Sequence, residues 1–186
     1  MKATLPAVAL CLLFAVPAFA KEVAGVNYPD TAKVGDKELK LNGVGLRKKV
    51  VFKVYTVGLY LETPSKDAAQ IIAADETKRV RMYMLRDLDK KTITEAISDG
   101  FKKNAGAKLP ALQPKLDSFN ASIPDLKKGD ELILTYVPGK GTEVKSTKGG
   151  EDISVEGKDF ADALFSVWLG KDPVDGGLKD GMLGKD

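Results

Sequence analysis

Arg47 is the residue with the clearest potential for ligand chemistry. It ends the segment GVGLR at residues 43–47 and precedes a long run of residues that favour β-strands. An extended segment at 38–47 would place Leu39, Leu41 and Arg47 on one face. A guanidinium that faces an apolar cavity needs a partner, because its unpaired burial costs several kcal/mol or more. The pattern therefore indicates that Arg47 binds either a protein carboxylate or an external anion.

Two further features of this segment bear on that choice. Gly43 and Gly45 carry no side chains, so the sheet surface beside them would be open and a ligand could lie against the backbone. In the alternative interpretation, Arg47 lies in solvent at a strand end, next to Lys48 and Lys49, and a bulge at a glycine reverses the faces. The pattern alone favours this second interpretation.

The segment FADALFSVWLG at residues 160–170 has the spacing of an amphipathic helix that packs on a sheet. Ser166 would be a small residue at a packing contact. Trp168, the only tryptophan of the chain, would pack in the core or at the helix end. Neither residue indicates a ligand site by itself.

The composition argues against several classes of site. The chain has no histidine and a single cysteine, so it lacks the commonest general base and the commonest zinc ligands. We expect no metal and no cofactor. The formal net charge of +3 is small, and the lysines alternate with acidic residues, so we expect no nucleic-acid partner.

The first twenty residues predict export. A charged start at Lys2, an apolar run and the small residues before Lys21 are typical of a secretory signal peptide cleaved after Ala20. The apolar run is too short to span a membrane, and Leu10 before Cys11 argues against lipid attachment. We expect a mature domain at 21–186 in the periplasm, without a stable membrane anchor.

The remaining patterns predict an α+β domain. The apolar residues of 50–62 alternate onto both faces, which is typical of a central strand covered on both sides. Strands in two runs, with helices between and after them, indicate an antiparallel sheet with helices packed on one face. We expect strands at 22–26, 33–46, 50–62, 78–86, 131–137, 142–146 and 152–155, and helices at 66–74, 89–104, 111–120 and 160–169.

Three segments taken together resemble the chalcone isomerase-like superfamily. They are LNGVGLRKKVVFKVYTVGLYLE at 41–62, DKKTITEAISDGF at 89–101 and FADALFSVWLGKDPVD at 160–175. The resemblance covers roughly residues 22–183, and the predicted export is similar to the bacterial branch. It implies an open-faced β-sandwich of chalcone isomerase type, with a ligand cleft between the large sheet and its helices.

The plant enzymes of this superfamily close a phenolic enone into a ring by positioning and electrostatic stabilisation. The resemblance assigns the phenolate-attracting arginine to Arg47, and this supports a functional role for that residue. It also implies a retained hydroxyl at Ser166 and a specificity position at Val167. Two polar positions differ, because Ile93 replaces the tyrosine that orders the catalytic water and Gly100 replaces an asparagine.

A third changed position points to another activity. Tyr55 stands where the enzymes have a threonine, and an arginine with a tyrosine is similar to the fatty-acid-binding relatives, in which this pair holds a carboxylate. Val57, Leu59 and Leu61 share the face of Tyr55 and would line an apolar channel. A register slip of one residue would send Tyr55 to the opposite face.

Three hypotheses follow. In the first, the protein binds a small amphipathic carboxylate such as a fatty acid, with Arg47 as anchor and Tyr55 as its partner. In the second, it is an intramolecular lyase of chalcone isomerase type that uses Arg47 and Ser166, with Tyr83 as a replacement for the lost tyrosine. In the third, the cleft is vestigial and the protein acts through protein contacts.

Overall fold

The computed structural model describes residues 20–149 and 152–185, so the predicted export signal lies outside the described residues except for Ala20. A seven-stranded antiparallel sheet forms the centre, and its strands are neighbours in chain order. The strands are β3 (Thr31–Val34), β4 (Lys37–Lys49), β5 (Phe52–Leu61), β6 (Lys78–Met84), β7 (Glu131–Val137), β8 (Gly141–Ser146) and β9 (Ile153–Val155). The predicted α+β class is confirmed.

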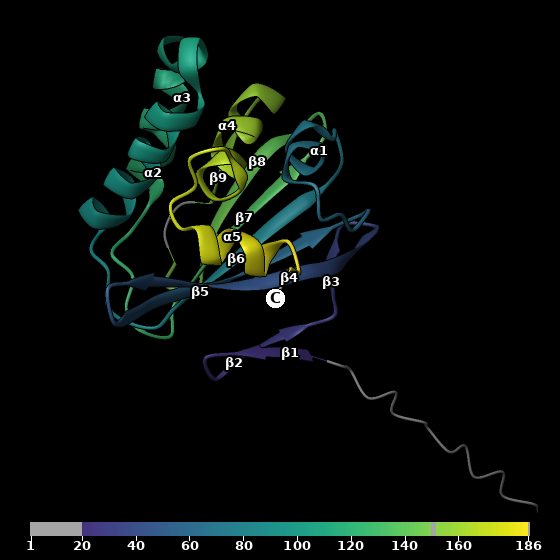
Figure 1. The fold of residues 1–186 in the computed structure, drawn as a ribbon. Coiled ribbons are helices and arrows are strands. Elements are labelled where there is room, and N and C mark those ends of the chain that lie inside the picture. Colours follow the sequence, from purple (N-terminus) through teal and green to yellow (C-terminus); the bar gives the residue numbers. More distant parts are fainter. Residues whose placement is uncertain (1–19, 150–151, 186) are drawn as a thin grey trace, which may run out of the picture.

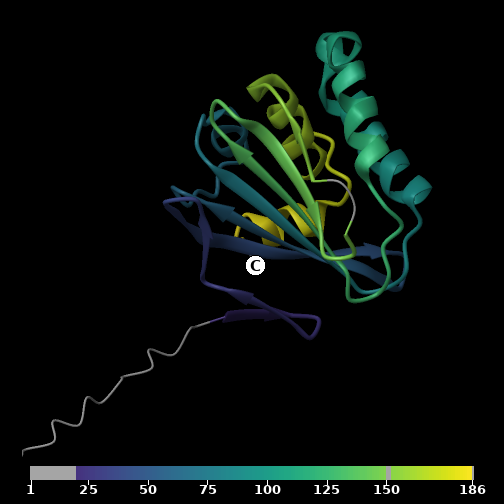
Figure 2. The ribbon, with the colours of Figure 1, turned by 180° about the vertical axis from the view of Figure 1, so that it is seen from behind.

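The helices cover one face of this sheet, and a hairpin covers part of the other (Figures 1 and 2). The hairpin pairs β1 (Ala20–Val23) with β2 (Val26–Pro29), and its Tyr28 packs into a second, smaller core with Leu39 and Tyr60. The helices and the main core lie on the opposite face. They are α1 (Ala68–Ala73), α2 (Lys90–Asn104), the 3₁₀ turn Gly106–Lys108, α3 (Leu109–Ser122), α4 (Lys158–Leu169) and α5 (Gly176–Met182).

Strand β5 is the central strand that the alternation predicts. Tyr55, Val57 and Leu59 point into the main core, whereas Tyr60 belongs to the smaller core on the other face. Burial on both faces explains why the sequence of this strand is apolar in both sets of alternate positions.

Several predicted boundaries are wrong. The segment 33–46 is two strands, because Gly35 adopts a positive φ of 60° and turns the chain between β3 and β4. Strand β4 continues to Lys49, beyond the predicted end at residue 46, and the β4–β5 hairpin turns at residues 50–51. Helix α1 begins at Ala68 instead of residue 66, because Asp67 is its N-cap and its carboxylate accepts hydrogen bonds from the backbone N–H groups of Ala69 and Gln70.

A bulge at Asn42 reverses the faces of β4. Leu41 pairs with Tyr60 and Gly43 with Leu59, so Asn42 is an extra residue in the strand. The prediction that Leu39 and Leu41 share the face of Arg47 is therefore wrong, because both pack with the smaller core. Asn42 is held by two hydrogen bonds, one to the carbonyl of Met182 and one from the N–H of Ser65.

Helix α5 packs on the bare strand surface at Gly43 and Gly45. An added Cβ on Gly45 would collide with the carbonyl oxygen of Leu178, and one on Gly43 would collide with that of Gly181. The expectation that this surface is open to a ligand is wrong, because the C-terminal helix fills it. Helix α5 is not among the predicted helices, because its three glycines are poor helix formers.

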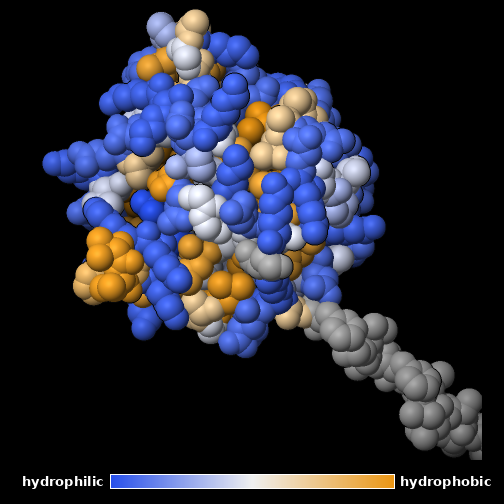
Figure 3. Space-filling model, in the orientation of Figure 1, coloured by the Kyte–Doolittle hydropathy of each residue, from blue (hydrophilic) through white to orange (hydrophobic). Residues whose placement is uncertain are grey.

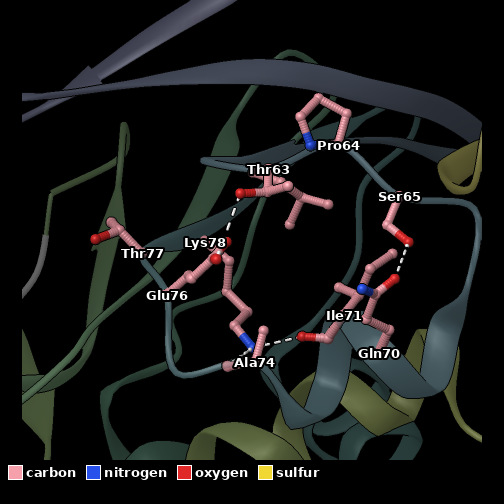
Figure 4. A pocket seen from close by; sticks show the side chains of 10 residues that line it. Thr63, Pro64, Ser65, Gln70, Ile71, Ala74, Glu76, Thr77 and Lys78 are labelled. Atoms are coloured by element: carbon pink, nitrogen blue, oxygen red, sulfur yellow. Dashed lines mark hydrogen bonds between the residues drawn. The ribbon is translucent and has the colours of Figure 1, made fainter.

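A buried lysine joins α1 to the sheet. Lys78, the first residue of β6, is 2 % exposed, and its ammonium group donates to the carbonyls of Ile71, Ile72 and Ala74 at 2.6, 3.2 and 2.8 Å. Figure 4 shows its side chain directed at the end of α1, beside a hollow of about 80 Å³. Because burial disfavours the charge, the pKa of Lys78 falls to about 8. Its contacts with the last carbonyls of α1 indicate a structural role.

We predict that Gly45→Ala destabilises the protein by about 1–3 kcal/mol, because α5 must move away from β4. Urea unfolding of both proteins measures the difference. Gly177→Ala is the matched control within α5, since its Cβ would meet only Asp175 Oδ1 at an ordinary 3.5 Å. The control should be neutral or stabilising by up to about 1 kcal/mol. A Gly45→Ala variant as stable as the wild type would contradict the packing of α5.

We predict that the unfolding free energy of the wild type rises relative to Lys78→Met as the pH increases from 8 to 10. The folded chain releases the Lys78 proton at about pH 8, whereas the unfolded chain holds it to about 10.5. The unfolded state therefore binds more protons in this interval, and stability rises with pH. We expect a relative gain of about 2 kcal/mol.

Lys66→Met, at an exposed position, is the control for this measurement and should show no such gain. A difference between wild type and Lys78→Met that is constant with pH would show that Lys78 is not titrating in this interval.

Candidate functional site

A cleft of about 320 Å³ lies beside the main core and has Arg47 in its lining. This volume is at the lower end of the range of about 300–1,000 Å³ that is usual for small-molecule sites. Strands β4, β5 and β6 contribute side chains to it, and the rest come from Leu88, α2, α4 and the chain before α5. Its apolar lining includes Val54, Met82, Ile93, Ile97, Val167, Trp168 and Val174.

Arg47 and Tyr55 are directly opposite each other in the β4–β5 pair. Directly opposed residues of an antiparallel pair project from the same face, so both side chains reach the cleft. The one-residue slip that would have separated them does not occur. The hairpin has a bulge between this pair and its turn: Lys48 pairs with Lys53, so Val54 is the extra residue of β5.

Asp175 is the partner of Arg47 within the protein. The Arg47 Nη1 group donates to Asp175 Oδ2 at 3.0 Å, and both side chains are about four-fifths buried, with 23 % and 18 % exposure. Of the two partners expected for a buried guanidinium, the protein therefore supplies a carboxylate, which comes from the C-terminal segment. Asp175 is also the N-cap of α5, since its Oδ1 accepts from the N–H of Leu178 at 2.9 Å.

This ion pair keeps Asp175 charged. Burial alone would raise the pKa of its carboxyl group, but the hydrogen bonds from Leu178 and Arg47 outweigh that effect and lower the pKa below its ordinary value. The Nη1 group of Arg47 also donates to the carbonyl of Lys48 at 2.8 Å. Both of its bonds use Nη1, so Asp175 leaves the Nε and Nη2 groups free of that carboxylate, and Arg47 lines the cleft.

Tyr55 is a hydrogen-bond donor at the same end of the cleft. Burial raises the pKa of its hydroxyl, although the nearby Trp168 and Arg47 act in the opposite direction. The phenol therefore stays protonated at neutral pH and can donate to an anion. It is 9 % exposed, so a ligand that bonds to it must enter the cleft.

Trp168 adds a donor that the sequence analysis did not assign to the site. Its indole N–H is buried and has no acceptor with good hydrogen-bond geometry in the described chain, although it is close enough to Tyr55 to lower the pKa of that hydroxyl. A buried donor without an acceptor is costly, so an oxygen atom in the cleft would be stabilising here. The available signal was its place next to Val167, which the resemblance assigns as a specificity position.

Ser166 does not lie in this cleft. Its hydroxyl donates to the carbonyl of Ala163 at 2.6 Å, and the residue borders a different hollow between α1 and α4. Neighbouring residues of a helix point in different directions, so Val167 faces the Arg47 cleft and Ser166 does not. The expectation that Ser166 contacts the ligand of Arg47 is therefore not supported by the geometry.

The other positions drawn from the resemblance are apolar or absent from the cleft. Ile93 lines it, and Gly100 allows α2 to approach Val167, because an added Cβ would lie 2.8 Å from that side chain. Tyr83 packs toward the smaller core on the opposite face of the sheet, so it does not replace the missing tyrosine. Thr92 is the hydroxyl that α2 does bring to the cleft.

Residues 20–149 and 152–185 contain neither a metal-binding cluster nor a helix that could span a membrane. No group of three or more His, Cys, Asp and Glu side chains in these ranges is arranged to hold a metal ion. None of their helices is long and apolar enough to cross a membrane.

Comparison with known proteins agrees with this architecture. The model of the chalcone isomerase-like family matches residues 20–184. No curated protein matches the chain. Among solved structures, a fatty-acid binding protein of Arabidopsis thaliana has a TM-score of 0.68 at 18 % identity, over 90 % of this chain and 97 % of that one. At this identity the likeness shows the fold alone.

The family model covers nearly the whole described chain, and the curled seven-stranded sheet with its helices matches the fold of the solved relative. The chain therefore belongs to the chalcone isomerase-like family.

Proposed function

We propose that the mature protein binds a small amphipathic carboxylate, such as a fatty acid, in the cleft beside Arg47. The observation that carries this proposal is the direct pairing of Arg47 and Tyr55 at one end of a cleft whose remaining lining is largely apolar. The solved relative is named a fatty-acid binding protein, which supports this class of ligand at the level of the family.

The polar end of the cleft suits a carboxylate. Arg47 has two nitrogen groups that Asp175 does not use, and Tyr55 and Trp168 each contribute one further donor. Hydrogen bonds from a guanidinium to a carboxylate are charge-assisted and therefore stronger than neutral ones. Asp175 is held by its own hydrogen bonds and repels an incoming anion, so affinity reflects the balance between Arg47 and Asp175.

The apolar part of the cleft suits a hydrocarbon tail. Met82, Ile93 and Val167 line it, and removal of apolar surface from water favours binding by about 25 cal/mol per Å². Lys49, Thr92, Glu95 and Asp99 also line the cleft, so the apolar surface forms one part of it. An amphipathic ligand thus meets a complementary environment at both ends.

The same lining gives less support to cyclisation of a phenolic enone. Ile93 replaces the residue that would order a water, and Ser166 lies outside the cleft. Arg47 and Tyr55 alone would stabilise a phenolate without a positioned proton donor for the enone carbon. The intramolecular lyase stays the alternative prediction, and the vestigial cleft is the outcome if no ligand binds.

Export to the periplasm is part of the proposal and rests on residues 1–20 of the sequence. A periplasmic location would place the protein beside membranes that contain acyl chains.

We predict that Arg47→Gln weakens fatty-acid binding at least about tenfold, because the charge-assisted bonds are lost. Trp168 lies in the cleft and is the only tryptophan, so titration of the mature protein with lauric acid can be followed by its fluorescence. Asp175→Asn should tighten binding, because the ligand carboxylate then supplies the counter-charge of Arg47 and the asparagine retains an oxygen for the α5 cap. Mass spectrometry of solvent extracts should find a fatty acid on the wild type and none on Arg47→Gln.

Arg86→Gln is the matched control, since Arg86 is an exposed arginine outside the cleft lining. It should bind as the wild type does. Equal affinity of Arg47→Gln and wild type would exclude Arg47 as the anchor. A wild type that neither retains nor binds a fatty acid would favour the vestigial cleft.

We predict that residues 1–20 are removed during export. Expression of the full chain in a bacterium followed by intact-mass measurement of the periplasmic fraction should give a protein that begins at Lys21. A chain that stays in the cytoplasm with residues 1–20 attached would refute this part of the proposal.

A further inference from the structure

The tip of the β4–β5 hairpin exposes three consecutive large apolar side chains. Val50, Val51 and Phe52 are 89 %, 80 % and 59 % exposed, and among the described residues they are the large hydrophobic side chains that stay in solvent. Figure 3 shows an orange projection at the lower left, at the place where Figure 1 shows the end of the β4–β5 hairpin. The exposed fractions assign these three residues to that end. Contiguous exposed apolar surface marks an interaction site.

The turn itself is built against local preference. Lys49 pairs with Phe52, so Val50 and Val51 form a two-residue loop, and Val50 has a φ of 58°. Such positions are normally occupied by glycine, asparagine or aspartate, and a β-branched residue there is an outlier. Val50 adds strain and buries almost none of its surface, so neither local conformation nor packing accounts for a valine at this place.

Positive charges flank the apolar tip. Lys48 and Lys53 lie on its two strands, and no carboxylate of the described chain forms an ion pair with either of them. Arg86 lies with its guanidinium 5.2 Å from the centre of the Phe52 ring. The adjacent carboxylate of Asp87 is engaged with Lys127 at 3.0 Å. The hairpin tip therefore combines exposed apolar side chains with neighbouring cations that form no ion pair within the described chain.

We propose that this tip, residues 48–53 with Arg86, docks reversibly on an anionic membrane surface. Val50, Val51 and Phe52 enter the boundary between headgroups and acyl chains, and Lys48, Lys53 and Arg86 contact the anionic headgroups. Apolar side chains with neighbouring cations are the combination that holds peripheral proteins at such surfaces. Three apolar side chains and the four cations of the tip, Lys49 included, give a weak, reversible contact, distinct from a stable anchor.

The tip adjoins the ligand cleft. Lys49 and Val54, on either side of the turn, both line the cleft, and Arg47 is three residues from Val50. Docking would therefore bring the polar end of the cleft close to the lipid headgroups, where the carboxylate of a fatty acid lies. This use of the contact rests on the proposed function, whereas the docking itself does not require a ligand.

The test is sedimentation of the mature protein with vesicles of phosphatidylcholine alone or with added phosphatidylglycerol. The wild type should bind the anionic vesicles, bind neutral vesicles weakly, and lose affinity as salt increases. The combined variant Val50→Asn, Val51→Ser and Phe52→Thr should lower binding to anionic vesicles at least about tenfold. Asparagine suits the positive φ of position 50, so this variant should fold.

A second pair of variants isolates the charge. Lys48→Gln with Lys53→Gln should weaken binding about tenfold or more, because each lysine near an anionic surface contributes to affinity. Lys33→Gln with Lys140→Gln makes the same change in net charge at the opposite end of the sheet and should bind as the wild type does. Equal loss in both pairs would overturn the proposal in favour of a general effect of net charge.

Other outcomes also decide against docking. Absence of vesicle binding by the wild type would overturn the proposal, and so would a wild-type dimer that the tip variant converts to a monomer without any vesicle binding. The tip variant should keep the Trp168 response to lauric acid in solution. Arg47→Gln should lose the Trp168 response but still bind vesicles. The tip variant should lose vesicle binding but keep the Trp168 response. These opposite results separate the two proposals.

Discussion

The ion pair between Arg47 and Asp175 is the interaction on which the arrangement of the cleft depends. A guanidinium that is four-fifths buried requires a counter-charge, and the chain supplies it from the N-cap of its last helix. The pair therefore connects the β4–β5 hairpin to α5, about 130 residues later in the sequence, and fixes the arginine beside Tyr55. It also leaves the arginine with donors that still face the cleft.

This pairing is possible because α5 approaches β4 closely. Gly43 and Gly45 on the strand and Gly181 on the helix lack the side chains that would hold the two backbones apart. The bulge at Asn42 places these glycines on the helical face and sends the leucines before them to the smaller core. The glycines of the GVGLR segment thus allow α5 to pack on β4. The cleft lies farther along the sheet, where α2 and α4 line it.

The sequence predicts those features that follow from local pattern. The alternation in β5 gives its two buried faces, and the spacing in α2 and α4 gives helices on the main core. Arg47 and Tyr55 are predicted as neighbours through a resemblance and are paired in the structure. The features that it misses arise from tertiary contacts: the Asn42 bulge, the glycine-rich α5 and its Asp175 have no local signal. Ser166 shows a further limit of prediction from sequence. The direction in which a helical side chain points can be predicted only when the packing of that helix is known.

The central claim is that the space beside Arg47 holds an amphipathic carboxylate, and a crystal structure of the mature chain with lauric acid tests it most directly. The account predicts density in the cleft with the carboxylate in hydrogen-bond distance of Arg47 and Tyr55 and the alkyl chain against Met82, Ile93 and Val167. A cleft closed by its own side chains, or a fatty acid bound elsewhere at the same concentration, would contradict it.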